Sequence, residues 1–174
     1  VNEGGGGGTD RISTTLNSFT LASLTNVENL TFTGTGDFTG TGNGLANTIT
    51  GGAGNDTIDA GGGVDRMVGV GGNDTYFVDT ATDVVVEAAG GGNDTMLSSV
   101  SDTIANNVET LTLTGLGNIN ATGNSAANRL NGNDGNNTLS GLLGADTLNG
   151  GLGNDSLSGG NANDRLIGGV GNDT

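Results

Sequence analysis

The sequence predicts an all-β solenoid built from short strands and tight turns. Three observations support this prediction: glycine supplies 37 of the 174 residues, an Asp or Asn recurs every nine residues through two long stretches, and an apolar side chain follows it two residues later. One apolar residue in nine fits neither a helix nor a long alternating strand. We therefore expect a strand of about three residues that points one side chain inward, followed by a turn.

The charge of the chain limits what it can do. Nineteen acidic residues against four arginines give a net charge of −15, so the chain either stays disordered or folds around cations. The absence of Cys, His and Lys excludes disulfides, thiolate or imidazole metal ligands, catalytic triads and phosphate-binding lysines. Neither nucleic acid nor membrane insertion is expected, because basic residues are few and no apolar run is long enough.

Two blocks alternate along the chain. The segment VENLTFTG at 27–34 returns as VETLTLTG at 108–115, an offset of nine nonapeptides. We predict a spacer block at 1–41, a repeat array at 42–86, a second spacer at 87–122 and a second array at 123–174. One continuous solenoid is expected, although the sequence leaves open whether the spacers continue it or interrupt it.

The spacers are predicted to contain strands. In 29–34 and 110–115, leucine or phenylalanine alternates with threonine, which is typical of a strand with one buried face. The stretch SFTLASLTNVE at 18–28 is the one place where a helix longer than a turn is an alternative.

The turns of the arrays resemble cation sites. We number each nonapeptide so that its Asp or Asn is position 6, as in GGAGNDTID, where Gly51 is position 1 and Asp56 is position 6. Successive glycines let the backbone aim carbonyl oxygens at one point. One turn supplies about three oxygens, whereas Ca²⁺ takes 6–8. If a coil holds two nonapeptides, turns that are two repeats apart would face each other and share an ion.

Oxygen ligands alone favour Ca²⁺ over Mg²⁺, and several ions are expected. The candidate ligands at position 6 are Asp56, Asp65, Asp74, Asp83, Asp146, Asp155, Asp164 and Asp173, with Asn47, Asn128 and Asn137 as weaker ligands. The candidate backbone ligands, at positions 2 and 4, are Gly52, Gly54, Gly61, Gly63, Gly72, Gly144, Gly151, Gly153, Gly160, Gly169 and Gly171.

Two local features remain open. Asp79, Asp83 and Glu87 in DTATDVVVE are either an additional calcium site or a solvated acidic loop that closes the first array. Ala162 occupies position 4, where a positive φ is expected, so the turn at 159–164 should be the strained one.

The segments GGAGNDTID, GGLGNDSLS and GGVGNDT match the pattern GGxGxDxUx, in which U is a large apolar residue. Over 42–86 and 123–174 the chain resembles the RTX repeats of exported bacterial proteins. The resemblance implies a right-handed parallel β-roll with Ca²⁺ between stacked turns. It also implies type I secretion in an unfolded state and folding in extracellular calcium.

We therefore expect a non-catalytic, monomeric segment of a larger secreted or cell-surface bacterial protein. Its partners would be calcium ions and the neighbouring domains that it supports as a scaffold. One rival is an adhesin or an ice- or polysaccharide-binding solenoid that uses a threonine-rich face. Another is a polysaccharide-modifying enzyme, which would have to work without His, Lys or Trp.

Overall fold

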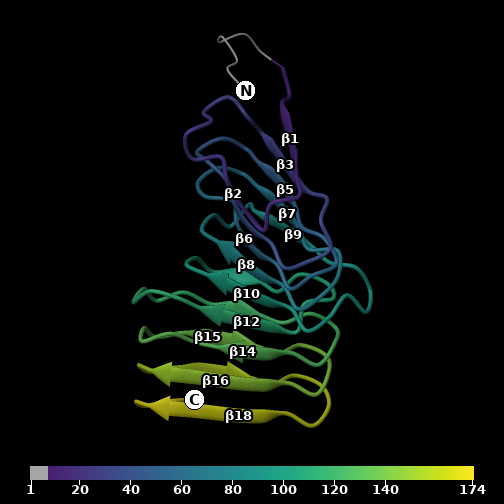
Figure 1. Ribbon diagram of the computed structural model, residues 1–174. Coiled ribbons are helices and arrows are strands. Elements are labelled where there is room, and N and C mark those ends of the chain that lie inside the picture. The colour runs from purple at the N-terminus through teal and green to yellow at the C-terminus, as the bar shows by residue number, and fades with distance from the viewer. Residues whose placement is uncertain (1–7) are drawn as a thin grey trace. The chain divides into compact units, whose positions relative to one another are not determined.

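The computed structural model describes residues 8–174 and comprises two units, one ending at Gly92 and one beginning at Asn93. In each unit the chain winds into coils with two short strands, and strands of successive coils pair in parallel (Figure 1). The fold is therefore an all-β parallel solenoid, as predicted. Residues 8–174 form no helix, so none of them could span a membrane as a helix. Residues 1–7 of the predicted first spacer lie outside the described residues.

The first unit has two sheets, with strand orders β1-β3-β5-β7-β9 and β2-β4-β6-β8. Its strands are β1 (Arg11–Thr14), β2 (Ser18–Thr20), β3 (Asn29–Phe32), β4 (Thr39–Thr41), β5 (Thr48–Thr50), β6 (Thr57–Asp59), β7 (Arg66–Val68), β8 (Thr75–Val78) and β9 (Val84–Val86).

The second unit repeats this arrangement with the orders β10-β12-β14-β16-β18 and β11-β13-β15-β17. Its strands are β10 (Thr95–Ser98), β11 (Asp102–Thr103), β12 (Thr110–Leu113), β13 (Ala121–Thr122), β14 (Arg129–Asn131), β15 (Thr138–Ser140), β16 (Thr147–Leu152), β17 (Ser156–Ser158) and β18 (Arg165–Val170).

The strand register shows how much of the chain makes one coil. In the arrays, Thr48 pairs with Arg66 and Thr147 with Arg165, so each coil consists of two nonapeptides. The spacer strands β3 and β12 join the same sheets, but the spacers also contain coils of other lengths. The coil from Thr95 to its partner Thr110 is three residues shorter than an array coil. The coil from Ser18 to its partner Thr39 is three residues longer, so within each unit unlike coils stack on the array.

The stretch 18–28 is not helical. It begins with β2 and continues through turns in which Leu24 N–H donates to Leu21 O at 2.7 Å and Val27 N–H to Leu24 O at 3.2 Å. Both Leu21 and Val27 are buried. The stacking of this coil on the next, through Leu21 N–H and Thr41 O at 2.8 Å, outweighs the local tendency to form a helix.

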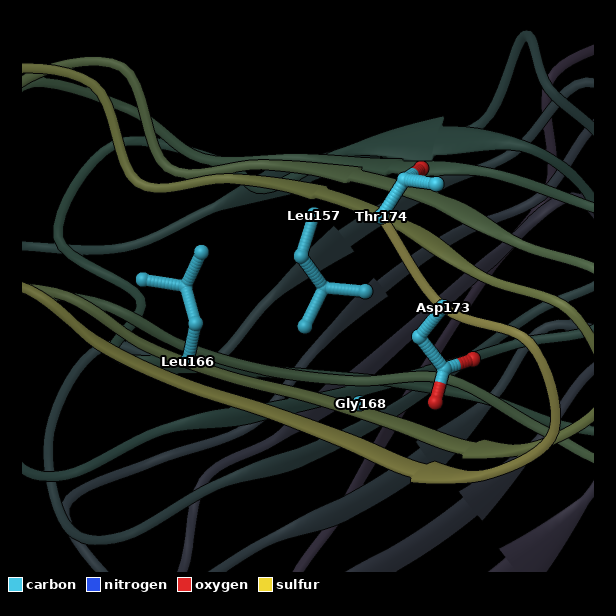
Figure 2. Close-up of a pocket in the computed structure, with 5 residues that line it drawn as sticks. All are labelled: Leu157, Leu166, Gly168, Asp173 and Thr174. Carbon is cyan, nitrogen blue, oxygen red and sulfur yellow. The ribbon is translucent and has the colours of Figure 1, made fainter.

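The core is a column of position-8 side chains inside each unit. These residues are fully buried at Ile49, Ile58, Met67, Tyr76, Leu130, Leu139 and Leu148. In the first spacer, Phe32 stacks on Phe38 with ring centroids 4.8 Å apart. The column is open at the last coil, where Leu166 is 46 % exposed and faces Leu157 across a hollow that Asp173 and Thr174 also line (Figure 2).

The position-8 column should dominate stability. Leu148→Ala removes a side chain that is 0 % exposed, so we expect the free energy of unfolding to fall by about 2–5 kcal/mol. Urea unfolding in saturating calcium measures it. The control is Leu116→Ala, at a residue that is 78 % exposed, for which a change within about 0.5 kcal/mol is expected. Equal losses in the two variants would contradict the role of the column.

Candidate metal centre

The position-6 side chains form a ladder along each edge of the solenoid. In the first unit, Asn47, Asp65 and Asp83 lie on one edge, and Asp56 and Asp74 on the other, each one coil apart. The second unit has the same arrangement, with Asn128, Asp146 and Asp164 on one edge and Asn137, Asp155 and Asp173 on the other. The structure thus brings together the pairs that a coil of two nonapeptides predicts.

The ladder carboxylates are buried because each coil is covered by the next. Asp56, Asp65 and Asp74 are each 1 % exposed, and Asp146 and Asp155 are each 2 % exposed. Asp83, Asp164 and Asp173, which end their ladders, are only partly buried. Burial of unpaired carboxylates on this scale is unfavourable unless something neutralises the charge.

One oxygen of each ladder carboxylate is bound by the backbone. Asp155 Oδ1 accepts a hydrogen bond from the N–H of Asn137 at 2.8 Å, and Asp65 Oδ1 accepts one from Asn47 N–H at 2.7 Å. Asp74, Asp83, Asp146, Asp164 and Asp173 accept the same bond from the position-6 residue of the preceding coil. The bond fixes the carboxylate against the preceding coil and leaves its second oxygen available for another contact.

The second oxygen of three ladder carboxylates has no hydrogen-bond donor. Oδ2 of Asp65, Asp146 and Asp155 is buried and accepts no hydrogen bond from any residue among 8–174. A buried oxygen that carries charge and has no donor is a strong unfavourable feature. A hard cation bound to it would remove that cost, so the residues fit the ion that the sequence predicts.

Backbone oxygens lie beside these carboxylates. A methyl group built on Gly150, at position 1, would overlap both Oδ2 of Asp155 and the carbonyl oxygen of Gly168 in the next coil. Gly141 stands in the same relation to Asp146 and Gly159. Carboxylate and carbonyl oxygens thus converge around position 1, which the sequence analysis did not select. The signal was present, since position 1 is glycine in most repeats.

Most glycines at positions 2 and 4 have the conformation expected of them. The φ angle is positive at Gly61, Gly63, Gly72, Gly144, Gly151, Gly153, Gly160, Gly169 and Gly171, but not at Gly52 and Gly54. At positions 2 and 4, three residues with side chains share this region of φ: Val70 at 90°, Leu142 at 72° and Ala162 at 87°. The sequence pointed to Ala162 alone, whereas the strain extends to two further turns.

The acidic loop DTATDVVVE does not gather its own carboxylates, since Asp79, Asp83 and Glu87 form no close group among the described residues. Asp83 extends the ladder by accepting the N–H of Asp65 at 3.0 Å. Glu87 is instead buried beside Asp74, and the hydroxyl of Tyr76 donates to Glu87 Oε1 and lies 3.4 Å from Asp74 Oδ2. A methyl group on Gly69 would overlap both Asp74 Oδ2 and Glu87 Oε1, so two buried carboxylate oxygens lie together beside this glycine.

Burial changes the acidity of the ladder. Desolvation raises the pKa of Asp65 to about 6 and that of Asp74 to about 7, and neighbouring carboxylates add to both shifts. Burial also raises the pKa of Asp56 and Asp146. Without a cation, burial therefore makes these four carboxyl groups hold a proton to a higher pH than they would in water.

A second ladder on one edge was missed by the sequence analysis. Asn172 N–H donates to Asn154 Oδ1 at 2.8 Å, Asn154 N–H to Asn136 at 2.7 Å, and Asn136 N–H to Asn118 at 2.9 Å. Asn73, Asn55 and Asp37 make the same ladder in the first unit. These position-5 residues recur once in every two nonapeptides, and that doubled period is the signal that identifies them.

These features define a class of protein: a parallel β-solenoid with buried carboxylates and converging backbone oxygens at its turns. The family model described as RTX calcium-binding nonapeptide repeat (4 copies) matches residues 41–76, 122–157 and 140–174. The chain belongs to this family, whose repeats bind Ca²⁺. Neither the comparison with curated proteins nor the comparison with solved structures finds a match.

The raised pKa values predict how the calcium-free chain responds to pH. The pKa of Asp65 is 3.8 in its ordinary state and about 6 in the fold, so the fold binds more protons than the unfolded chain. The stability that the protonated Asp65 and Asp74 contribute is then fully present below pH 4 and is lost as the pH rises through about 6 to 7. Circular dichroism of the calcium-stripped chain should show more β-structure at pH 5 than at pH 8.

In this pH experiment, Asp65→Asn should weaken the pH dependence, whereas Asp134→Asn, at an exposed position-3 residue, should leave it unchanged. A β-content that stays constant or rises between pH 5 and pH 8 would contradict the assignment.

The strained turns predict a stabilising substitution. Leu142→Gly relieves a φ of 72° that a side chain disfavours, so the free energy of unfolding should rise by about 1 kcal/mol. Leu143→Gly is the matched control, because Leu143 is equally exposed but is not among the residues with positive φ. That control should lose about 0.5–1 kcal/mol. Thermal unfolding in saturating calcium measures both variants. A lower free energy of unfolding in Leu142→Gly would contradict the claim that the Leu142 side chain strains this turn.

Proposed function

We propose that this RTX segment is a calcium-coupled folding module, which gains its structure when ions enter the ladder. The observation that supports it most directly is the set of buried, donor-free oxygens at Asp65, Asp146 and Asp155. A protein that folded without a cation would leave these charges buried and unneutralised. The unfolded chain leaves them in water, so ions that bind only the folded chain favour folding.

The magnitudes support a decisive role for the ion. A site filled at 100 times its dissociation constant stabilises the folded state by about 2.7 kcal/mol. Two such sites contribute about 5 kcal/mol, which equals the whole stability of many small domains. With a net charge of −15, the chain has little else to oppose its self-repulsion, so calcium would decide whether it folds.

The ligands we propose are the position-6 aspartates Asp56, Asp65, Asp74, Asp83, Asp146, Asp155, Asp164 and Asp173, together with backbone oxygens of the turns. Asp65, Asp146 and Asp155 have the strongest support, because each has a buried oxygen without a donor. Carbonyl groups at position 1, such as that of Gly168, are added to those predicted at positions 2 and 4. Oxygen ligands at adaptable distances favour Ca²⁺ over Mg²⁺.

The family suggests where this folding takes place, because RTX repeats are typical of bacterial proteins exported by type I secretion. We infer that the chain leaves the cell unfolded in low calcium and folds outside it. The folded solenoid would then serve as a non-catalytic scaffold for neighbouring domains of a larger secreted or cell-surface protein. Repetition suits this role, since each coil supports the next.

A binding module remains the second candidate, because Thr39, Thr57 and Thr75 stand in register on three successive strands. The adjacent row contains Thr41, Asp59 and Phe77, so the threonine surface is one residue wide and does not form a regular two-row face. This interruption favours the calcium-folding function over ice or polysaccharide binding.

Circular dichroism during a calcium titration of the stripped chain tests the proposed function. We expect a cooperative gain of β-structure at about 10⁻⁴–10⁻³ M calcium and none with magnesium. Asp155→Ala should raise the calcium midpoint, because it removes a buried ligand. Asp134→Ala removes the same charge from an exposed position and should leave the midpoint within about twofold. A stripped chain already folded and indifferent to calcium would refute the function and favour the binding module.

A further inference from the structure

The turns of the arrays fall into two conformations. In one, which we call closed, the N–H of position 2 donates to the side-chain oxygen of position 6. This bond measures 2.8 Å from Asn43 to Asn47 and 2.9 Å from Asn133 to Asn137. The closed turns are 42–47, 51–56, 123–128 and 132–137, and none of their residues has a positive φ.

The other conformation, which we call open, has positive φ at both position 2 and position 4. It occurs at 60–65, 69–74, 141–146, 150–155, 159–164 and 168–173. The donor-free oxygens of Asp65, Asp146 and Asp155 all belong to open turns. Closed turns instead stack on a spacer coil, as the contacts of Asn47 with Val27 and of Asn137 with Ile119 show.

Three of the closed turns share the pattern GNxxxN, with Asn at positions 2 and 6: GNGLAN at 42–47, GNSAAN at 123–128 and GNDGNN at 132–137. In these turns the position-2 side chain also accepts a hydrogen bond from the N–H of position 4, at 2.8–2.9 Å. The position-2 amide then points its Nδ2 at the spacer coil. Asn43 Nδ2 donates to Leu24 O at 2.9 Å and to Val27 O at 3.0 Å.

The position-6 amides do the same. Asn47 Nδ2 donates to Val27 O at 3.2 Å and to Glu28 O at 3.3 Å, and Asn137 Nδ2 donates to Ile119 O at 2.6 Å. Asn128 Nδ2 donates to Val108 O at 3.4 Å. The spacer thus presents carbonyl oxygens to these turns, and the asparagine amide groups donate to them. An array coil presents an N–H group instead, which an aspartate oxygen accepts.

We propose that the GNxxxN turns are hydrogen-bonded joints that fix each spacer to its array without a cation. This inference rests on the proposed function. Calcium then does not bind in the GNxxxN turns, and Asn47, Asn128 and Asn137 are not calcium ligands. The reason is electrostatic: a cation and amide hydrogens are both positive, so they compete for the same carbonyl oxygens. An aspartate in the same place would face carbonyl oxygens and would require an ion.

The variant Asn47→Asp in the full chain tests whether these asparagines are weak calcium ligands or parts of a cation-free joint. If Asn47 were a weak calcium ligand, the added carboxylate would strengthen binding and lower the calcium midpoint in circular dichroism. If it is a cation-free joint, the carboxylate loses two donated hydrogen bonds and meets Val27 O and Glu28 O. The midpoint should then rise by about twofold or more. A lower midpoint would overturn the proposal.

Bound calcium per chain, counted by equilibrium dialysis at saturating calcium, gives a second readout. Asn43→Ala should keep the wild-type number of ions, whereas Asp65→Asn should lose at least one. Loss of an ion in Asn43→Ala would overturn the proposal that the GNxxxN turns hold no cation. Wild type that binds no calcium would instead refute the proposed function, so the two failures are distinct. Asn124→Ala repeats the test in the second unit, and circular dichroism confirms that each variant is folded.

Discussion

The structure depends on one constraint: a carboxylate has to be buried at the same point of successive coils. Stacking covers Asp65, Asp146 and Asp155 so completely that water cannot solvate them. One oxygen of each is satisfied by a backbone N–H from the preceding coil, but the other has no donor among the described residues. A carboxylate in such an arrangement is tolerable only when a proton or a counter-charge neutralises it, and the chain offers no lysine and few arginines to supply the counter-charge. The demand for an external cation follows from the stacking itself.

The backbone of the turn follows from the same stacking. At Gly141 and Gly150 the coils lie so close that a side chain at position 1 would overlap the next coil, so glycine is a packing requirement at these two residues. Positive φ at positions 2 and 4 turns the backbone around the carboxylate, and the chain accepts strain at Val70, Leu142 and Ala162 to keep that shape. One edge is further reinforced by the position-5 asparagine ladder, which needs no ion.

Different coil–coil contacts are thus stabilised by different interactions, some by neutral hydrogen bonds and others by ionic contacts. Where an array coil follows an array coil, carboxylate oxygens face N–H groups and a cation completes the contact in our proposal. At the three GNxxxN turns that follow a spacer, asparagine amides face carbonyl groups and complete the contact themselves, whereas Asp56 accepts the N–H of Phe38 from its spacer coil. Beside Asp74 the contact is of a third kind, made by the phenol hydroxyl of Tyr76 and the second carboxylate of Glu87. In each kind of contact, the side chain supplies the donor or acceptor that the adjacent coil lacks.

The nine-residue period is enough to predict the inward position-8 side chains of each array and, once two nonapeptides are assigned to a coil, the facing pairs of aspartates. Both depend only on a spacing that can be read along the chain, whereas the register of the strands shows that a coil holds two nonapeptides. Other features required the folded chain: the spacers stack through coils shorter and longer than those of the arrays, Tyr76 reaches a carboxylate, and Asn47 acts as a donor. The physical reason is that a side chain's hydrogen-bond role is set by the group opposite it in the neighbouring coil. That group is fixed by strand register, and local sequence does not specify register between unlike coils.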